Sequence, residues 1–110
     1  MIPRIATAFC SGLSRTAGQC GAVNGGILAI SLVAGRDDHE APFDDCYVAV
    51  QRFLEAFQAL HDTQTCPGLL GINIAEPEGL EQFHAQGMIE TCYGLVELTT
   101  RLALESLAAQ

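Results

Sequence analysis

The segment PFDDCYVAVQRFLEAFQALH, residues 42–61, carries the clearest signal for the fold. Its apolar and aromatic side chains recur at steps of three and four residues, which is the repeat of an amphipathic α-helix. The stripe consists of Phe43, Tyr47, Val50, Leu54, Phe57 and His61. Pro42 suits a first helical turn, and Asp44 and Asp45 are favourable beside the positive end of the helix dipole. We therefore predict a helix over residues 42–61 that buries this stripe.

The rest of the chain also indicates helices. They are predicted over residues 2–9, 21–35, 65–70, 77–86 and 88–108. Thr65 can cap its helix, while Gly35 and Gly71 end theirs. Residues 11–19 are predicted as a turn or loop, and no alternating pattern of useful length predicts a strand. We expect one all-α domain over residues 1–110, a compact bundle of about four to six helices.

Composition excludes several classes of protein. The chain has 110 residues, of which 49% are hydrophobic and only 16% charged, so we expect a homo-oligomer, a dimer, that hides some of this apolar surface. The net charge is -8 and the five arginines are scattered, which argues against binding nucleic acid. We recognise no secretory signal and no apolar stretch long enough for a bilayer. We therefore expect a cytoplasmic protein without membrane insertion.

Five cysteines are the main candidates for chemistry. They are Cys10, Cys20, Cys46, Cys66 and Cys92. In a reducing cytosol they would not form a structural disulfide framework. Three interpretations remain, namely small buried hydrophobic residues, a redox set, or metal ligands. Cys46 is predicted to be a packing residue.

Three of these thiols lie near predicted helix starts. Cys20 directly precedes Gly21, where free amide groups and the helix dipole would lower the pKa of the thiol. Cys66 has a similar position, and Cys92 lies in the first turns of the last helix, on its apolar stripe. The alternative is that these cysteines only pack, and that Gly21 and Gly25, one turn apart, serve close helix packing. Because there is no C-x-x-C motif, only the fold can bring the thiols together.

The sequence around these cysteines resembles a known family. CGAVNG, starting at Cys20, is similar to the CGAxxG signature of the C-GCAxxG-C-C family of redox-active proteins. The resemblance runs from Ile5 to Leu104. It includes an A-x-x-F…G…R approach to the signature, F-x-x-x-F at residues 53–57, CPGLL at residues 66–70 and CYGLV at residues 92–96.

The resemblance implies a helical fold, redox chemistry at Cys20, Cys66 and Cys92, and a redox or transporter-associated partner protein. It names no substrate and no cofactor. The N-terminal helix with the family's first cysteine is expected to be missing from this chain. Cys10 is a candidate substitute for that cysteine.

Three functions are consistent with these residues. The first is thiol–disulfide or electron-transfer chemistry through Cys20, Cys66 and Cys92. The second is a site for a metal ion or an iron–sulfur cluster on the same cysteines, completed by Cys10, His61 or a residue of another subunit. The third is a non-catalytic oligomeric interaction protein. Whether the protein is an enzyme is left open.

Overall fold

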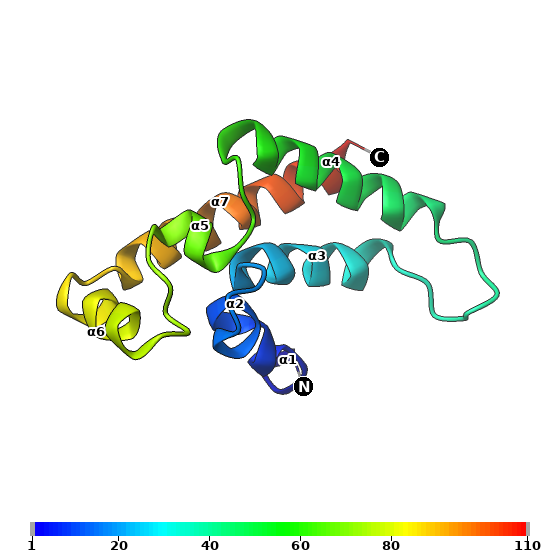
Figure 1. Cartoon of the computed structure of the whole chain (residues 1–110). Coiled ribbons are helices and arrows are strands. Elements are labelled where there is room, and N and C mark those ends of the chain that lie inside the picture. The colour runs from blue at the N-terminus through cyan, green and yellow to red at the C-terminus, as the bar shows by residue number, and fades with distance from the viewer. Residues whose placement is uncertain (1, 110) are drawn as a thin grey trace.

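The structure, a computed structural model, describes residues 2–109 as helices joined by loops (Figure 1). The elements are α1 (Ile2–Ala6), the 3-10 helix η1 (Thr7–Phe9), α2 (Cys10–Arg15), α3 (Gly21–Ala34), α4 (Asp44–Leu60), α5 (Cys66–Leu70), α6 (Pro77–Ala85) and α7 (Ile89–Ala108). No strand occurs within residues 2–109, which confirms the all-α prediction. None of the helices in this range is long and apolar enough to cross a membrane.

Local chemistry sets several helix ends where the sequence predicted them. Helix α3 begins at Gly21 and stops before Gly35. Helix α5 is capped by Thr65, whose side-chain oxygen accepts a hydrogen bond from the Gly68 N–H at 3.2 Å. It closes on Gly71, whose φ of 76° lies in the left-handed region that glycine adopts without strain.

The three long helices form the main core. Helix α7 packs along both α3 and α4, and α3 packs against α4 (Figure 1). The largest wholly buried side chains are Phe53, Phe57, Ile30 and Val23. Gly26 makes room for one of them, because a methyl group at this position would collide with the Phe53 ring. The small residue on α3 thus allows close packing against α4.

The predicted buried stripe of α4 is wrong in part. The wholly buried residues of this helix are Ala49, Phe53 and Phe57, spaced four residues apart. Phe43 and Tyr47, predicted to be buried, are 43% and 56% exposed and instead pack on each other with ring centroids 4.5 Å apart. Both stripes fit a helical repeat, so contact with α3 and α7 decides which face is buried.

The segment predicted as a loop at residues 11–19 contains an unusual turn. Residues 11–15 all have positive φ, between 54° and 65°, so α2 winds in the left-handed sense. Such a conformation costs about 1–2 kcal/mol for each residue with a side chain. A hydrogen bond from the Ser14 hydroxyl to the Ala8 carbonyl, 2.9 Å long, ties this turn to η1.

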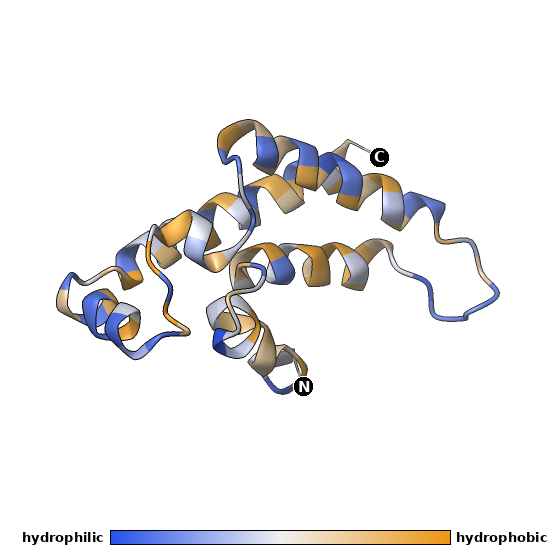
Figure 2. Cartoon of the chain, in the orientation of Figure 1, coloured by the Kyte–Doolittle hydropathy of each residue, from blue (hydrophilic) through white to orange (hydrophobic). Residues whose placement is uncertain are grey.

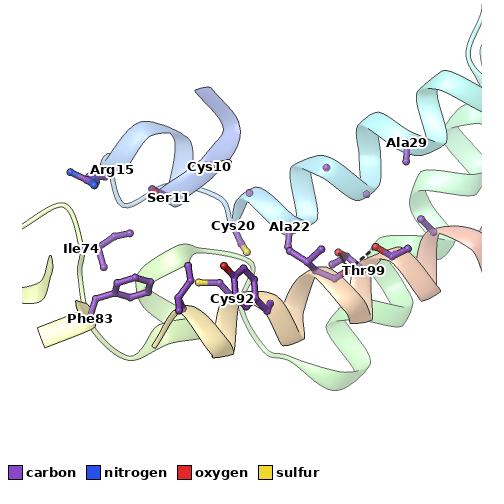
Figure 3. A pocket seen from close by; sticks show the side chains of 18 of the residues that line it. Cys10, Ser11, Arg15, Cys20, Ala22, Ala29, Ile74, Phe83, Cys92 and Thr99 are labelled. Carbon is purple, nitrogen blue, oxygen red and sulfur yellow. Dashed lines mark hydrogen bonds between the residues drawn. The ribbon is translucent and has the colours of Figure 1, made fainter. Parts of the chain in front are cut away.

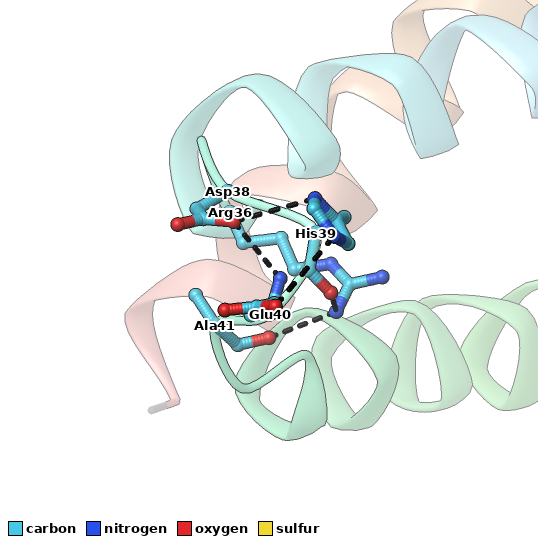
Figure 4. Close-up of polar contacts among 5 residues, drawn as sticks. All are labelled: Arg36, Asp38, His39, Glu40 and Ala41. Carbon is cyan, nitrogen blue, oxygen red and sulfur yellow. Dashed lines mark hydrogen bonds and ion pairs between the residues drawn. The ribbon is translucent and has the colours of Figure 1, made fainter.

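The charged loop between α3 and α4 is closed by an arginine (Figure 4). The Arg36 guanidinium donates hydrogen bonds to the carbonyls of His39, at 2.6 Å, and Ala41, at 2.8 Å. It also lies 5.3 Å from the centroid of the Phe43 ring. The His39 imidazole is 3.5 Å from the Asp38 carboxylate, but both side chains are largely exposed, so this pair contributes little to stability.

Candidate thiol site

Cys20 and Cys66 are brought together by a short pairing of two loops. The Cys20 N–H donates to the Gln64 carbonyl at 2.7 Å, and the Cys66 N–H donates to the Gly18 carbonyl at 2.8 Å. These two bonds flank an isolated antiparallel β-bridge. The pairing holds the start of α3 beside the start of α5, although the two segments are distant in the sequence.

Gly12 covers Cys66 from the side of the N-terminal segment. A methyl group on Gly12 would lie 2.7 Å from the Cys66 Cβ and 3.0 Å from the Gly18 carbonyl oxygen. Gly12 also has a φ of 63°, so two separate constraints favour glycine here. As a result Cys66 is buried. This role of Gly12 was not predicted from the sequence, where Gly12 stands out only by its place in the family-like approach to the CGAxxG motif.

Cys92 joins the other two thiols from α7. Cys66 belongs to a small apolar cluster whose other buried members are Leu70, Ile74 and Phe83. Cys92 is half-buried and packs against this cluster, whereas Cys20 is half-buried and packs against the core of the long helices. The three thiols therefore meet where the two apolar clusters adjoin.

The electrostatics of the thiols differ from the prediction. Burial raises the pKa of the Cys66 thiol, and negative charge on Cys20 and Cys92 raises it further. Burial also raises the pKa of Cys92, with a second contribution from Cys20. A position near a helix start therefore does not lower the pKa of Cys66 or Cys92, because desolvation opposes ionisation and each thiolate repels the next. This coupling agrees with the packing, which places the three cysteines where the two apolar clusters adjoin.

A groove of about 730 Å³ runs between α3 and α7 and opens toward α2 and α6 (Figure 3). Cys10, Cys20 and Cys92 line one end of it, and Figure 3 shows Cys20 and Cys92 facing the space between the start of α3 and the first turns of α7. The lining is mostly apolar and contains no aspartate or glutamate among the described residues. Cys66 does not line this groove. Two of the three predicted site cysteines are therefore open to a molecule in the groove.

The remaining candidates lie apart from this cluster or at its edge. Cys10 is exposed at the groove, and its backbone lies against Gly21. Cys46 packs against the core with its sulfur 4.0 Å from the Ser31 hydroxyl oxygen, in keeping with its interpretation as a packing residue. The His61 ring packs 5.1 Å from that of Phe57, at the end of α4.

The geometry gives the metal hypothesis no support from a single chain. Within residues 2–109, no group of three or more His, Cys, Asp or Glu side chains is arranged to hold a metal ion. Neither Cys10 nor His61 completes a set of ligands with the three clustered thiols. A metal ion or iron–sulfur cluster on Cys20, Cys66 and Cys92 stays a prediction that would need ligands from another subunit.

Comparison with known proteins agrees with the family resemblance. A family model described as "Putative redox-active protein (C_GCAxxG_C_C)" matches residues 1–106. The matched range contains Cys20, Cys66 and Cys92. No curated protein and no solved structure matches the chain.

Proposed function

The chain belongs to the C_GCAxxG_C_C family of redox-active proteins, and from this premise we propose that it carries out thiol–disulfide exchange through Cys20 and Cys92. The observation that carries the proposal is the convergence of three thiols from separate elements. Backbone hydrogen bonds hold Cys20 beside Cys66, Cys92 packs on the cluster that contains Cys66, and charge on Cys20 raises the pKa of both other thiols. Of the three, Cys20 and Cys92 line the groove, where a substrate disulfide can reach them.

Cys20 is the attacking thiol in this proposal. It is the N-cap of the 14-residue helix α3, where free amide groups favour negative charge. Its thiolate attacks one sulfur of a substrate disulfide, which breaks the substrate S–S bond, forms a mixed disulfide on Cys20 and releases the first substrate thiolate. That thiolate takes up one proton, which balances the proton that Cys20 lost when it ionised.

Cys92 is the resolving thiol. Once Cys20 is in the mixed disulfide it carries no charge, and one of the two causes that raise the pKa of Cys92 disappears. The Cys92 thiolate then attacks the Cys20 sulfur, forms the Cys20–Cys92 disulfide and releases the second substrate thiolate. The protein loses two electrons and two protons, and the substrate disulfide becomes two thiols. The reverse sequence oxidises a substrate dithiol.

Cys66 remains a thiol through this cycle. It is buried beneath Gly12, and burial raises its pKa. A protonated and covered thiol is a poor nucleophile toward a disulfide in solution. We infer that Cys66 supports the site as a buried member of the apolar cluster against which Cys92 packs.

The remaining predictions fit this function. A cytoplasmic location would keep the cysteines reduced between cycles, as exchange with an incoming disulfide requires. A redox or transporter-associated partner protein would supply that disulfide. Whether the reaction is catalytic depends on a second partner that reduces the protein again.

The test is to map the disulfide that forms on mild oxidation. Reduced full-length protein is treated with glutathione disulfide, free thiols are alkylated under denaturing conditions, and the linked peptides are identified by mass spectrometry. We expect one intramolecular disulfide joining Cys20 and Cys92, with loss of two hydrogens from the intact mass. Glutathione adducts alone, or a disulfide through Cys66, would contradict the assignment.

Two serine variants test whether the disulfide depends on Cys20 in particular or forms with any half-buried cysteine. Cys20→Ser should abolish the disulfide and leave Cys92 alkylated. Cys46→Ser is the matched control, because Cys46 is half-buried like Cys20 but packs against the core away from the groove. This control should form the disulfide at the rate of the unmodified protein.

A further inference from the structure

The molecule exposes more surface than a compact chain of its mass. Its accessible surface is 7005 Å², whereas a folded monomer of 11.7 kDa exposes about 5,900 Å². The radius of gyration, 14.9 Å, also exceeds the value of about 13 Å for a compact domain of this length. The Cα positions span only 17 Å along the shortest axis, so the fold is thin. About 1,100 Å² of surface is in excess.

One exposed apolar surface of the chain is a face of α3 and α7. Helix α4 packs on one side of this helix pair, and no α4 residue lines the groove on its other side. We define the α3–α7 face as the groove-lining residues Gly25, Ala29, Val33, Val96, Leu104 and Leu107. Val33 and Leu104 are 72% and 64% exposed, and Figure 2 shows apolar positions repeated along both helices. Within residues 2–109 the other members of this face are also exposed except Leu107, which is half-buried against the main core.

Among the described residues, nothing packs against Gly25 closely enough to require a glycine there. A methyl group at Gly25 would meet no atom within 4 Å, in contrast to Gly21 and Gly26, whose neighbours leave no room for one. Glycine inside a helix costs about 0.5–1 kcal/mol relative to alanine. At this position the absence of a side chain instead lets a further backbone approach α3 closely.

We propose that the α3–α7 face is a symmetric dimer interface, covered by the same face of a second copy of this chain. A stable interface buries about 800 Å² per partner, which lies within the roughly 1,100 Å² by which the surface of the whole chain exceeds that of a compact monomer. Two chains of net charge -8 repel each other, but this face carries no carboxylate that would be buried against its counterpart. A twofold axis pairs the face with itself, so one surface serves both copies.

The proposed interface and the thiols share one groove. Val33, Leu104 and Leu107 lie toward the C-terminal ends of their helices, whereas Cys20 and Cys92 lie at the opposite end of the groove. Gly25 and Val96 lie about one turn from Cys20 and Cys92, so the interface covers the apolar end of the groove and borders its thiol end. The existence of the dimer does not depend on the proposed exchange reaction.

Sedimentation equilibrium of the full-length, reduced protein tests this interface. The unmodified protein should sediment at twice its chain mass of 11.7 kDa. Leu104→Glu would bury a carboxylate at the interface, and should raise the dissociation constant by at least on the order of tenfold. Leu60→Glu is the matched control, because Leu60 is 60% exposed at the end of α4 and does not line the groove. This control should remain dimeric.

Gly25→Leu provides a second variant that the monomer can accommodate. The added side chain meets open space in the single chain, so the helical circular dichroism should be retained while the dimer dissociates. A monomeric unmodified protein would overturn the proposal and leave the groove to a small apolar ligand or an unrelated protein. A Leu104→Glu dimer as tight as the unmodified one, or equal dissociation of the Leu60→Glu control, would also overturn it.

Discussion

Around α3, α4 and α7 the chain buries large apolar side chains, whereas around Cys20 and Cys66 it uses backbone hydrogen bonds and glycine contacts. Phe53 and Phe57 are wholly buried in the first region. The second region depends on the pairing of two loops and on Gly12 at positive φ. Stability and reactivity thus reside in different parts of one small molecule. Changes in the helical core should alter folding, while changes at the thiol end should mainly alter the thiols.

The largest effect is expected in the helical core. Phe53→Ala removes a wholly buried ring that packs against Gly26, and should lower the free energy of unfolding by about 3–5 kcal/mol. Urea unfolding followed by circular dichroism measures it. Phe43→Ala, at a half-exposed ring before α4, should cost far less. Equal losses at the two positions would show that this core does not dominate stability.

A smaller effect is expected where Gly12 covers Cys66. Gly12→Ala places a methyl group 2.7 Å from the Cys66 Cβ at a φ of 63°, and should lower the free energy of unfolding by about 1–3 kcal/mol. It should also speed alkylation of Cys66, as the N-terminal segment is displaced. Gly94→Ala, where a methyl group meets nothing within 4 Å, should instead stabilise helix α7 by about 0.5–1 kcal/mol. Unchanged Cys66 reactivity in Gly12→Ala would disprove the covering role.

Removing the helix cap beside Cys66 should lower the free energy of unfolding by a somewhat smaller amount. Thr65→Ala removes the acceptor of the Gly68 N–H bond and should cost about 1 kcal/mol in the free energy of unfolding. Thr65→Ser keeps the hydroxyl acceptor and should restore most of that loss. If both variants unfold alike, the cap contributes nothing to the thiol end.

The smallest expected effect is on the stability of the protein at alkaline pH. The raised pKa values of Cys66 and Cys92 mean that the folded chain keeps these protons when the unfolded chain has begun to lose them. Their contribution to stability is therefore complete below the ordinary thiol pKa of 9.0 and is lost as the pH rises through the folded values. Urea unfolding across this range should show a shallower decline in Cys66→Ala than in Cys46→Ala. Parallel declines would contradict the assigned shift.

The sequence predicted those features that local chemistry decides. The start of α3 at Gly21, the Thr65 cap and the stop at Gly71 depend on residues within one turn, and the structure confirms them. The buried face of α4 depends on where α3 and α7 lie, so a helical repeat that included Tyr47 gave the wrong stripe. The left-handed turn at residues 11–15 runs against the preference of its non-glycine residues, so no local rule predicts it.

The candidate site, too, could be predicted from the sequence only where local chemistry decides. The position of Cys20 before a helix was visible in the sequence, as was the family resemblance. The meeting of Cys20 with Cys66 and Cys92 was not, because it depends on hydrogen bonds between residues 18–20 and 64–66. The raised pKa values of Cys66 and Cys92 were also hidden, since burial follows from tertiary packing and opposes the effect of a helix end.

Thiol–disulfide exchange through Cys20 and Cys92 is most directly tested by a redox titration of the unmodified protein. The protein is equilibrated in glutathione buffers of stepped potential, quenched with acid and alkylated, and the occupancy of each cysteine is read by peptide mass spectrometry. Cys20 and Cys92 should lose alkylation together in one two-electron transition, while Cys46 stays alkylated throughout. Independent oxidation of Cys20 and Cys92 to separate glutathione adducts would contradict the proposed exchange.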